Sequence, residues 1–440
     1  MNLVESVKLA GVVGAGGGGF PAHVKLAAPA DTVIANGAEC EPLLHKDGVV
    51  MEHFAARLVR GVELSMAAVG AATGVIAVKA KNEHAVAAVQ AAVARSRVRV
   101  QLLGDYYPVG DEFDLVHEVT GRLIPPGGIP LNVGVVVNNV EPLVNIAEAA
   151  DGRPVIRKFL TVAGAVRTPM TLAAPVGTSL AECLAAAGGA ATDDPVLCLG
   201  GMMMGETTDR LDTPVTKTTT GVIVLPRGHP VVQRKLQPPT VQARIGKSAC
   251  DQCRYCTEYC PRFLLGYAVE PHQVMRGLGF TGAADGARWN DWAALCCTCG
   301  LCTLFACPEQ LFPKEACDDA KTGLRAAGRK WSGPTKVTPH PMREGRRVPI
   351  KALLRRLDLQ PYDAPAPLRA EPLAPARVVL RLKQSAGAAS QPLVRPGERV
   401  RVTQPVAEPP AGALGAWLHA PFAAVVDAVT ATELHLTRLP

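Results

Sequence analysis

Two short cysteine runs constrain this chain more than any other feature of its sequence. Eight of the thirteen cysteines occupy them at regular spacing. The first run reads C-x2-C-x2-C-x3-C-P, and the second repeats it except that four residues, rather than three, precede its last cysteine. At this spacing, three thiolates of one run hold a cubane [4Fe–4S] cluster and the fourth ligand comes from the other run. The sequence therefore predicts two clusters, one held by Cys250, Cys253, Cys256 and Cys307 and the other by Cys296, Cys299, Cys302 and Cys260.

Other uses of these cysteines explain the pattern less well. A structural zinc site takes four ligands and would leave half of the two runs without a role. Disulfide frameworks are typical of small secreted domains, whereas this chain has 440 residues. One ambiguity stays open within the second run. Cys297 is the alternative to Cys296 as a ligand, although only Cys296 keeps two residues before Cys299.

Length and composition bound the remaining possibilities. A chain of 440 residues can form three or four domains. The formal net charge of +7 is spread along the chain, and only 4% of the residues are aromatic, which argues against nucleic-acid binding. No stretch is long and apolar enough for a transmembrane helix, and the N-terminus lacks the pattern of a secretory signal. Because free thiolates need a reducing compartment, we expect a soluble, cytoplasmic protein.

The first 150 residues alternate apolar runs with helical patterns. Buried strands are predicted over 32–35, 75–79, 98–103 and 133–137, and helices over 51–72 and 83–94. Such alternation is typical of a mostly parallel sheet covered by helices, which is a Rossmann-like arrangement.

A glycine-rich loop and an acidic segment mark the candidate cofactor site of this region. Residues 14–21 read GAGGGGFP, and glycine permits both positive φ and the close approach of backbone amides to an anion. Residues 36–42 read NGAECEP and directly follow a predicted strand. The carboxyl end of a strand in an α/β sheet is where cofactors bind. A glycine-rich loop alone is weak evidence, because such a run can also be a flexible turn.

Taken together, these motifs resemble a known group of flavoproteins. They are similar to the flavin-bearing subunit of respiratory NADH dehydrogenase. The resemblance is closer still to RnfC, a component of the Rnf electron-transport complex, and to the cobalamin reductases of propanediol-utilisation microcompartments. Further matching segments are YPVGDE at 107–112, TGRLIP at 120–125 and VGVVVNNV at 133–140. The resemblance covers nearly the whole chain.

The resemblance implies FMN bound across the glycine-rich loop, with the nicotinamide of NADH stacked on the flavin. Carried over by position, it implies three groups of residues. Facing the phosphate and ribityl chain would be Gly14, Gly16, Gly17 and Lys25. Hydrogen-bonding the flavin would be Asn36, Glu39, Asn138 and Asn139. Meeting the nicotinamide nucleotide would be Glu41, Glu112 and Phe20.

Structural explanations compete with several of these assignments. The adjacent Asn138 and Asn139 could cap a helix that begins near Glu141. Both Glu39 and Glu41 could be solvated acids in a loop. Two departures from the family pattern are Gly18, where alanine is usual, and Asp111 in place of a glycine before Glu112.

The resemblance extends over the other domains. Residues 1–150 would form the Rossmann-like FMN/NADH domain, 151–237 a β-grasp (SLBB) module, and 238–330 a dicluster ferredoxin-like insert. A Pro- and Arg-rich linker would follow over 331–370, with a short helix at 350–357, and a barrel-sandwich (lipoyl-like) module over 371–440. The GGMMMG run at 200–205 sits in a predicted loop, where packing explains methionines better than a metal or cobalamin contact. No lysine follows Lys383, so a lipoyl or biotin carrier role is not expected.

The family resemblance implies an NADH-dependent oxidoreductase that carries electrons through FMN and the two clusters to cobalamin. Its partners would be NADH, cobalamin with an adenosyltransferase, and a microcompartment shell protein, and its location inside or attached to a microcompartment. One alternative is a soluble electron carrier that regenerates NAD⁺ or serves another redox partner. A second alternative is a non-enzymatic scaffold that retains clusters without flavin chemistry.

Overall fold

The computed structural model describes residues 2–280 and 289–440. A four-stranded parallel sheet with the strand order β3-β2-β1-β5 is the centre of the N-terminal region. The strands are β1 (Thr32–Gly37), β2 (Thr73–Lys79), β3 (Val98–Leu103) and β5 (Val135–Asn139). This confirms the predicted parallel arrangement. The strand predicted over 133–137 begins two residues later, because Pro130–Val133 form a 3₁₀ turn, η1.

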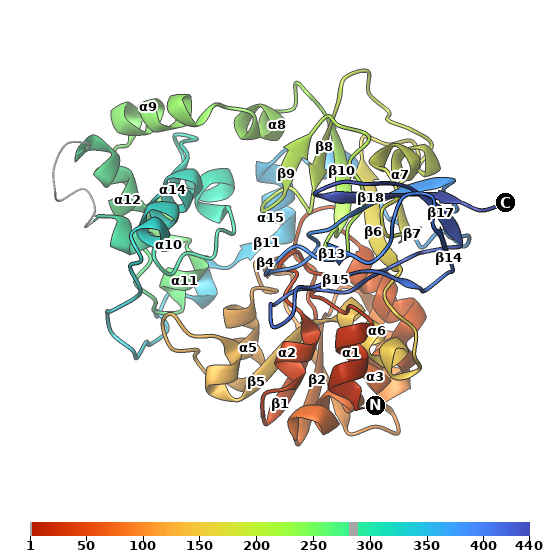
Figure 1. Ribbon diagram of the computed structural model, residues 1–440. Helices are drawn as coiled ribbons and strands as arrows, with labels where there is room; N and C mark the ends of the chain where they lie inside the picture. The colour runs from red at the N-terminus through yellow and green to blue at the C-terminus, as the bar shows by residue number, and fades with distance from the viewer. Residues whose placement is uncertain (1, 281–288) are drawn as a thin grey trace.

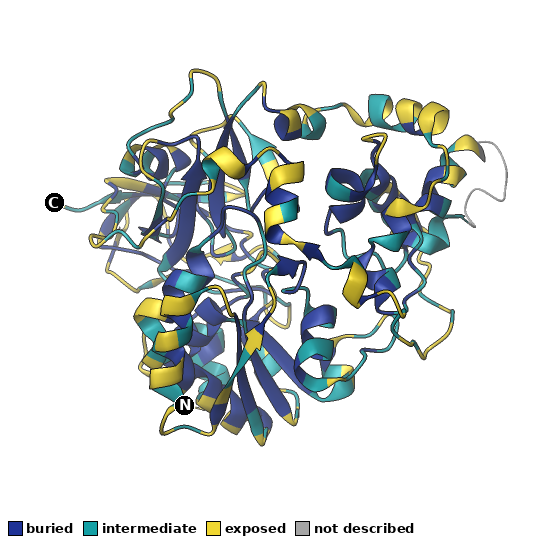
Figure 2. Ribbon diagram, turned by 180° about the vertical axis from the view of Figure 1, so that it is seen from behind, coloured by how far each residue is buried: buried dark blue, intermediate teal, exposed yellow. Residues whose placement is uncertain are grey.

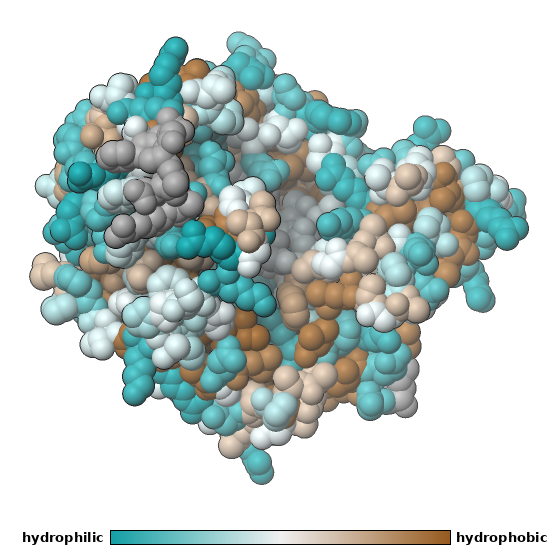
Figure 3. Space-filling model, turned by 60° about the vertical axis from the view of Figure 1, so that its left-hand side comes forward, coloured by the Kyte–Doolittle hydropathy of each residue, from teal (hydrophilic) through white to brown (hydrophobic). Residues whose placement is uncertain are grey.

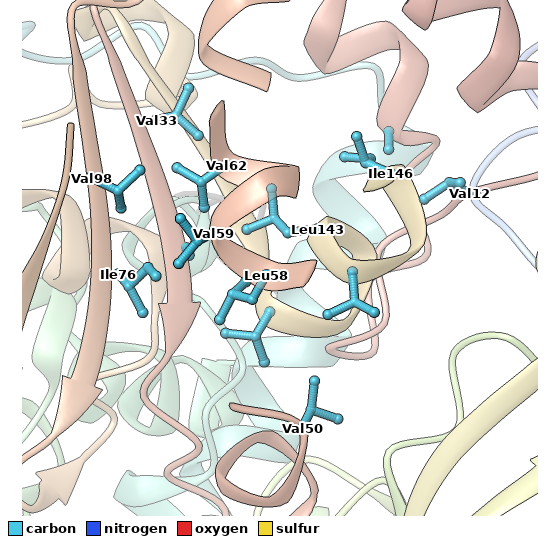
Figure 4. Close-up of a cluster of buried hydrophobic side chains, with 14 of the residues drawn as sticks. Val12, Val33, Val50, Leu58, Val59, Val62, Ile76, Val98, Leu143 and Ile146 are labelled. Atoms are coloured by element: carbon cyan, nitrogen blue, oxygen red, sulfur yellow. The ribbon is translucent and has the colours of Figure 1, made fainter. Parts of the chain in front are cut away.

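Helices cover both faces of this sheet. Along each strand, alternate side chains point to opposite faces, so Val33 and Ile76 pack beneath α3 and α6, whereas Ile34 and Val75 pack against α5. Figure 4 shows the first of these clusters, between the strands and the helices α3 and α6. The helices of this region are α1 (Leu3–Leu9), α2 (Ala22–Leu26), α3 (Lys46–Val69), α4 (Glu83–Val93), α5 (Glu112–Thr120) and α6 (Val140–Ala150).

A second, mixed sheet follows in the order β7-β6-β10-β8-β9. Its central strands β6 and β10 are parallel, and its other neighbours are antiparallel, as in a β-grasp module. Ser179 caps the helix α7, and Glu182 completes a capping box, which fixes where the helix begins. The elements are β6 (Arg157–Gly164), β7 (Met170–Pro175), α7 (Leu180–Ala186), β8 (Pro195–Leu199), β9 (Glu206–Thr208), β10 (Gly221–Pro226) and α8 (Pro230–Lys235).

The two cysteine runs lie in a separate helical lobe. Most of its α-helices begin with a proline at the first helical position, where a missing N–H costs no hydrogen bond. This lobe lies to one side of the two sheets in Figure 1. Its elements are α9 (Pro239–Ala249), α10 (Tyr255–Glu258), α11 (Pro261–Leu264), α12 (Pro271–Gly277), η2 (Leu278–Phe280), η3 (Asp291–Ala293), η4 (Cys302–Ala306) and α14 (Pro313–Ala326).

Residues 331–370, predicted as a linker, make extensive contacts between the other parts. The strand β11 (Val348–Pro349) pairs with β4 (Tyr106–Tyr107) of the N-terminal region. The helix α15 (Ile350–Arg356) buries Leu353 in a core shared with the β-grasp sheet and the helical lobe. Arg343 of the same segment donates to Asp114 at 2.7 Å. The short 3₁₀ turns η5 (Glu344–Arg346) and η6 (Gln360–Tyr362) complete this segment.

The C-terminal residues form two small packed sheets. One has the order β12-β18-β17-β14 and the other β13-β15-β16, and their inward-facing residues make a core of their own. Within the described residues, no helix is long and apolar enough to cross a membrane. The strands are β12 (Arg377–Arg381), β13 (Gln391–Pro392), β14 (Arg399–Val400), β15 (Pro405–Glu408), β16 (Leu418–His419), β17 (Ala424–Val429) and β18 (Glu433–Arg438).

The β-grasp sheet and the C-terminal sheets lie side by side above the N-terminal sheet (Figure 1). Buried residues are concentrated in the strands of the N-terminal and β-grasp sheets, as the view from behind shows (Figure 2). The helical lobe stands in front in Figure 3, where a hollow separates it from the rest of the surface. The fold therefore brings several regions of the chain together around one central space.

Candidate functional site

A cavity of about 770 Å³ opens at the carboxyl ends of β1 and β5. Cavities of this size hold cofactor-sized ligands, and the carboxyl edge of an α/β sheet is where such ligands bind. Its wall comes from segments that are far apart in the sequence. They are the glycine-rich loop at 16–18, the segment 36–41 after β1, residues 107–112, the β-grasp loops at 199–206 and 218–220, and the cysteines Cys297 and Cys299.

The cavity brings together most of the residues predicted to bind FMN or NADH. Its wall includes Gly16, Gly17, Asn36, Glu39, Glu41, Glu112 and Asn139. The residues Gly14, Phe20, Lys25 and Asn138 are outside that wall. The individual roles of both groups remain predictions.

The glycine-rich loop leaves open space on the side of the cavity. Gly17 has a φ of 103°, a conformation that favours glycine. A Cβ atom added at Gly17 or Gly18 would meet no atom within 4 Å. The loop closes on itself, because the amide of Gly14 donates to the carbonyl of Phe20 at 2.9 Å. Its outer backbone is therefore accessible to an anionic ligand, as its composition predicts.

Two acids line the cavity directly after β1, and neither is a freely solvated loop residue. Glu39 Oε2 accepts from the amide of Asp47 at 2.9 Å. Burial, with the charge of Asp47 adding to it, raises the pKa of Glu39 from 4.5 to about 8. Glu41 accepts from the amides of Met203 and Met204, each at 2.8 Å. Burial raises the pKa of Glu41 to about 7 despite these bonds. Both side chains can therefore change protonation state near neutral pH.

The Glu41 contact also accounts for the glycine that precedes the methionine run. Met202 and Met203 are fully buried in the core below the loop, as packing predicts, whereas Met204 is about half exposed at the cavity wall. A Cβ atom on Gly201 would lie 2.4 Å from Glu41 Oε2. The small glycine thus allows the β-grasp loop to bind the carboxylate with its backbone.

The asparagines at the strand ends have structural partners. Asn36 uses both ends of its amide, donating to the carbonyl of Gly110 at 2.9 Å and accepting from the amide of Ala38 at 3.1 Å. Asn139 caps α6 and donates to Asp47 Oδ2 at 2.7 Å. The predicted capping role is thus confirmed for Asn139. The buried Nδ2 of Asn138 has no hydrogen-bond partner among the described residues.

A buried lysine that was not among the predicted site residues holds this corner together. Lys46 Nζ lies 2.7 Å from Asp47 Oδ1, 3.2 Å from Glu141 Oε2 and 3.1 Å from Asn139 Oδ1. Burial opposes its charge, but Asp47 and Glu141 outweigh that effect and raise the pKa of Lys46. Glu141 also contacts the buried Lys158. No motif marks Lys46, because its partners come from separate segments.

The predicted phosphate ligand Lys25 is paired within the protein. Its Nζ donates to the carbonyl of Val137 at 2.7 Å and lies 3.3 Å from Glu112 Oε1. Glu112 itself lines the cavity. The positive charge of Lys25 therefore stands behind Glu112 rather than at the cavity wall.

The first predicted ligand set meets in space. The thiols of Cys250, Cys253, Cys256 and Cys307 line one small cavity, although Cys307 comes from the other run. Cys253 is exposed, whereas Cys256 and Cys307 are buried. Within the described residues, no three His, Cys, Asp or Glu side chains converge tightly enough to hold a single metal ion. Thiols around a cavity fit a cluster, whose iron atoms occupy separate corners.

The second set is buried deeper in the lobe. Burial raises the pKa of the Cys260 thiol, and the neighbouring thiols of Cys297 and Cys296 raise it further. A hydrogen bond with Cys317, a buried thiol on α14, lowers the pKa of Cys296 to about 7. Cys317 lies outside both runs, so their spacing gave no signal for it. The choice between Cys296 and Cys297 remains a prediction.

The extra residue in the second run has a clear local explanation. Residues Cys302–Ala306 form a π-helical turn, η4, whereas the corresponding stretch of the first run contains the α-helical turn α10. A π turn accommodates one more residue than an α turn and is frequent at functional sites. The wider turn therefore absorbs the insertion before Cys307.

The second cysteine run reaches the wall of the large cavity. Cys297 and Cys299 line it, and the hydroxyl of Tyr107, another lining residue, donates to the carbonyl of Cys299 at 2.6 Å. On the same side, Arg262 pairs with Asp111 at 2.9 Å. The flavin-type cavity and one cluster-type site are therefore immediate neighbours.

Comparison with known families assigns each region. The Nuo51 FMN-binding domain matches residues 7–148, and the SLBB domain matches residues 159–207. The 4Fe-4S dicluster domain matches residues 249–312, and the RnfC barrel sandwich hybrid domain matches residues 366–438. The fold class predicted from the sequence is therefore confirmed.

Two curated relatives match nearly the whole chain, and a third matches part of it. Cobalamin reductase PduS of Salmonella typhimurium is 44% identical over 438 residues, which cover 99% of this chain and 96% of the relative. The protein of the same name from Citrobacter freundii is 42% identical over 438 residues, which again cover 99% of this chain and 96% of the relative. The C component of the Na⁺-translocating ferredoxin:NAD⁺ oxidoreductase complex of Acetobacterium woodii is 36% identical, over 59% of this chain and 57% of the relative.

Proposed function

The chain belongs to the family of cobalamin reductase PduS, and on that basis we propose that it passes electrons from NADH through FMN and two [4Fe–4S] clusters to cobalamin. It is an oxidoreductase with an FMN-binding domain and an iron–sulfur domain. The observation that carries the proposal is the shared wall of the large cavity. The glycine-rich loop forms one side of that cavity, and Cys297 and Cys299 form another.

The chain's own residues would define the flavin site. We propose that the amides at Gly16 and Gly17 bind the phosphate end of FMN, since that loop is open to the cavity. Glu39 and Glu41 would hold protons near the reacting ring, because burial raises the pKa of both groups towards neutrality. Bound FMN accepts a hydride and releases its electrons singly, which suits one-electron cluster chemistry.

We propose the cluster ligands that the spacing of the two cysteine runs predicts. One cluster would be held by Cys250, Cys253, Cys256 and Cys307, whose thiols line one cavity. The other would be held by Cys296, Cys299, Cys302 and Cys260. Since the second set adjoins the large cavity, we propose that it is the set nearer the flavin.

The first experiment tests electron entry and exit separately. The protein is purified without oxygen, reconstituted with iron, sulfide and FMN, and mixed with NADH. We expect the flavin absorbance to bleach and added cob(II)alamin to be reduced, trapped by an adenosyltransferase. A protein that binds no flavin, or whose flavin NADH leaves oxidised, contradicts the proposal.

A pair of variants tests whether cobalamin receives its electrons through the clusters. Cys256→Ala removes a proposed ligand, whereas Cys183→Ala removes a buried thiol of the β-grasp core. In Cys256→Ala, flavin bleaching by NADH should persist while cobalamin reduction is lost. Cys183→Ala should retain both activities. Full cobalamin reduction by Cys256→Ala would show that the proposed route is wrong.

The similarity to a component of a ferredoxin:NAD⁺ oxidoreductase complex favours one alternative, a carrier that exchanges electrons between nicotinamide and another redox protein. Reduction of ferredoxin or a dye without any reduction of cobalamin would support it. A scaffold without flavin chemistry would show cluster spectra and no response to NADH.

We also propose that the protein works inside or attached to a bacterial microcompartment, beside an adenosyltransferase and a shell protein. This proposal is based on membership of the cobalamin reductase PduS family. Co-purification of the tagged chain with intact microcompartments tests it. Recovery in the unattached fraction alone would oppose it.

A further inference from the structure

A buried lysine of the β-grasp domain joins three regions at the edge of the large cavity. Lys217 is 2% exposed. Its Nζ donates to the carbonyl of Gly11, before the glycine-rich loop, at 2.8 Å. The same atom donates to the carbonyl of Trp417 in the C-terminal domain at 2.7 Å. The backbone amide of Lys217 donates to Gln384 Oε1 of that domain at 3.0 Å.

This junction is tightly packed and has an unusual excess of polar groups. A Cβ atom on Gly11 would lie 2.2 Å from the carbonyl oxygen of Trp417, so only glycine fits there. Burial lowers the pKa of Lys217 to about 7. Three further buried polar atoms lack a hydrogen-bond partner among the described residues: Gln384 Nε2, Trp417 Nε1 and His419 Nδ1. Because buried polar groups are costly, stability alone is a poor explanation for this arrangement.

A loop of threonines that follows this lysine lies on the cavity wall. Thr218, Thr219 and Thr220 directly follow it and line the cavity. The hydroxyl of Thr216 bonds to those of Thr218 and Thr219, at 3.0 and 3.1 Å, which orders the turn internally. Thr220 is different. It is 8% exposed, and its hydroxyl has no partner among the described residues.

The C-terminal domain also contacts the glycine-rich loop itself. The amide of Ala386 donates to the carbonyl of Gly19 at 3.0 Å. A Cβ atom on Gly19 would lie 3.0 Å from the methyl group of Thr218 and 3.3 Å from the Cα atom of Ser385. The Gly19 end of the glycine-rich loop is thus in contact with both the threonine loop and the C-terminal domain. Loosening either neighbour should loosen the proposed phosphate-binding backbone.

We propose that the β-grasp and C-terminal domains complete the flavin site, with Thr220 donating a hydrogen bond to FMN and Lys217 acting as the positioning residue for Thr220 and the glycine-rich loop. The inference rests on the proposed FMN site. It gives the C-terminal domain a role in cofactor binding, although no described residue of that domain lines the cavity.

FMN titration of the complete reconstituted chain, followed by quenching of flavin fluorescence, tests the proposal. Thr220→Val keeps the side-chain shape and removes the hydroxyl, so we expect FMN to bind about tenfold more weakly. Lys217→Met removes both carbonyl contacts and should weaken binding at least as much. The matched controls Thr335→Val and Lys383→Met change exposed residues and should bind FMN as the native chain does.

A second readout separates positioning from general destabilisation. Hydrogen exchange of Lys217→Met should increase at residues 14–20 and 384–387, while cluster iron stays at the native level and excess FMN restores bleaching by NADH. If Thr220→Val and Lys217→Met bind FMN as tightly as the native chain, the proposal is overturned. It is also overturned if Lys217→Met loses FMN and iron together while Thr220→Val binds FMN normally. A native chain that binds no FMN instead contradicts the proposed function.

Discussion

The cluster sites and the large cavity are built in opposite ways. Three proposed ligands of each cluster follow one another at short spacing within a single run, and the lobe needs only to supply the fourth from the other run, as it does for Cys307. The cavity has no comparable local code. Its wall combines a glycine-rich loop, a strand end, two β-grasp loops and two cysteines. A site built from local spacing can be read from a sequence, whereas for a site at the junction of domains the sequence shows the separate motifs but not how they meet.

Iron content tests the local side of this comparison and has the largest expected effect. Cys296→Ala should remove about half of the cluster iron, because each cubane needs its four thiolates. Cys317→Ala and Cys297→Ala should retain it, although Cys317 is hydrogen-bonded to Cys296. Iron and sulfide analysis with electron paramagnetic resonance measures the outcome. Full iron content in Cys296→Ala together with a loss in Cys297→Ala would reverse the assignment.

A pair of helix glycines tests how tightly each region is packed. Gly61 lies on α3 where a Cβ atom would come within 1.9 Å of the carbonyl oxygen of Leu143 on α6. Gly61→Ala should therefore destabilise the chain by about 2–3 kcal/mol through overpacking. Gly323 on α14 of the helical lobe has no atom within 4 Å of that position. Gly323→Ala should instead stabilise by about 0.5–1 kcal/mol, since alanine favours helix.

Denaturant unfolding under anaerobic conditions measures both free energies. Equal effects of the two substitutions would contradict the close packing of α3 on α6. The cavity edge depends on that packing, because α3 begins with Lys46 and Asp47.

The pH dependence of stability tests the electrostatics of the cavity, with a smaller expected effect. In the folded chain, burial raises the pKa of Glu39 from 4.5 to about 8. Because Glu39 binds its proton more tightly in the folded chain, the protonated side chain stabilises the fold. This contribution is complete below pH 4.5 and is lost as the pH rises to about 8. Glu39→Gln should therefore be less sensitive to alkali than the native chain.

Thermal unfolding between about pH 6 and pH 9 checks this expectation. The variant should gain in stability relative to the native chain as the pH rises. The exposed Glu83→Gln serves as the control and should follow the native curve. Parallel curves for Glu39→Gln and the native chain would show that ionisation of Glu39 does not lower the stability of the folded chain.

Much of the fold was predictable from the sequence because its signals are local. The parallel strands are apolar runs, and Ser179 with Glu182 marks the start of α7. The helix α15 was also predicted, but its environment was not. Its polar residues Lys351, Arg355 and Arg356 are exposed. Its apolar residues Ile350, Leu353 and Leu354 are buried in the core between domains. An amphipathic pattern predicts that a helix has an apolar face, not what covers it.

Local patterns in the sequence identify the cofactor chemistry. They are the thiolates at cluster spacing, and a glycine-rich loop before a strand that leads into Asn36, Glu39 and Glu41. Where these groups meet depends on how the domains pack. This packing placed Cys299 beside the flavin-type cavity, bound Glu41 to the methionine loop, and buried Lys46 and Lys217 at junctions. The two kinds of interaction differ in how far apart along the chain their residues lie. Ligand spacing and turn chemistry act over a few residues, whereas these contacts join segments that only the packing of whole domains brings together.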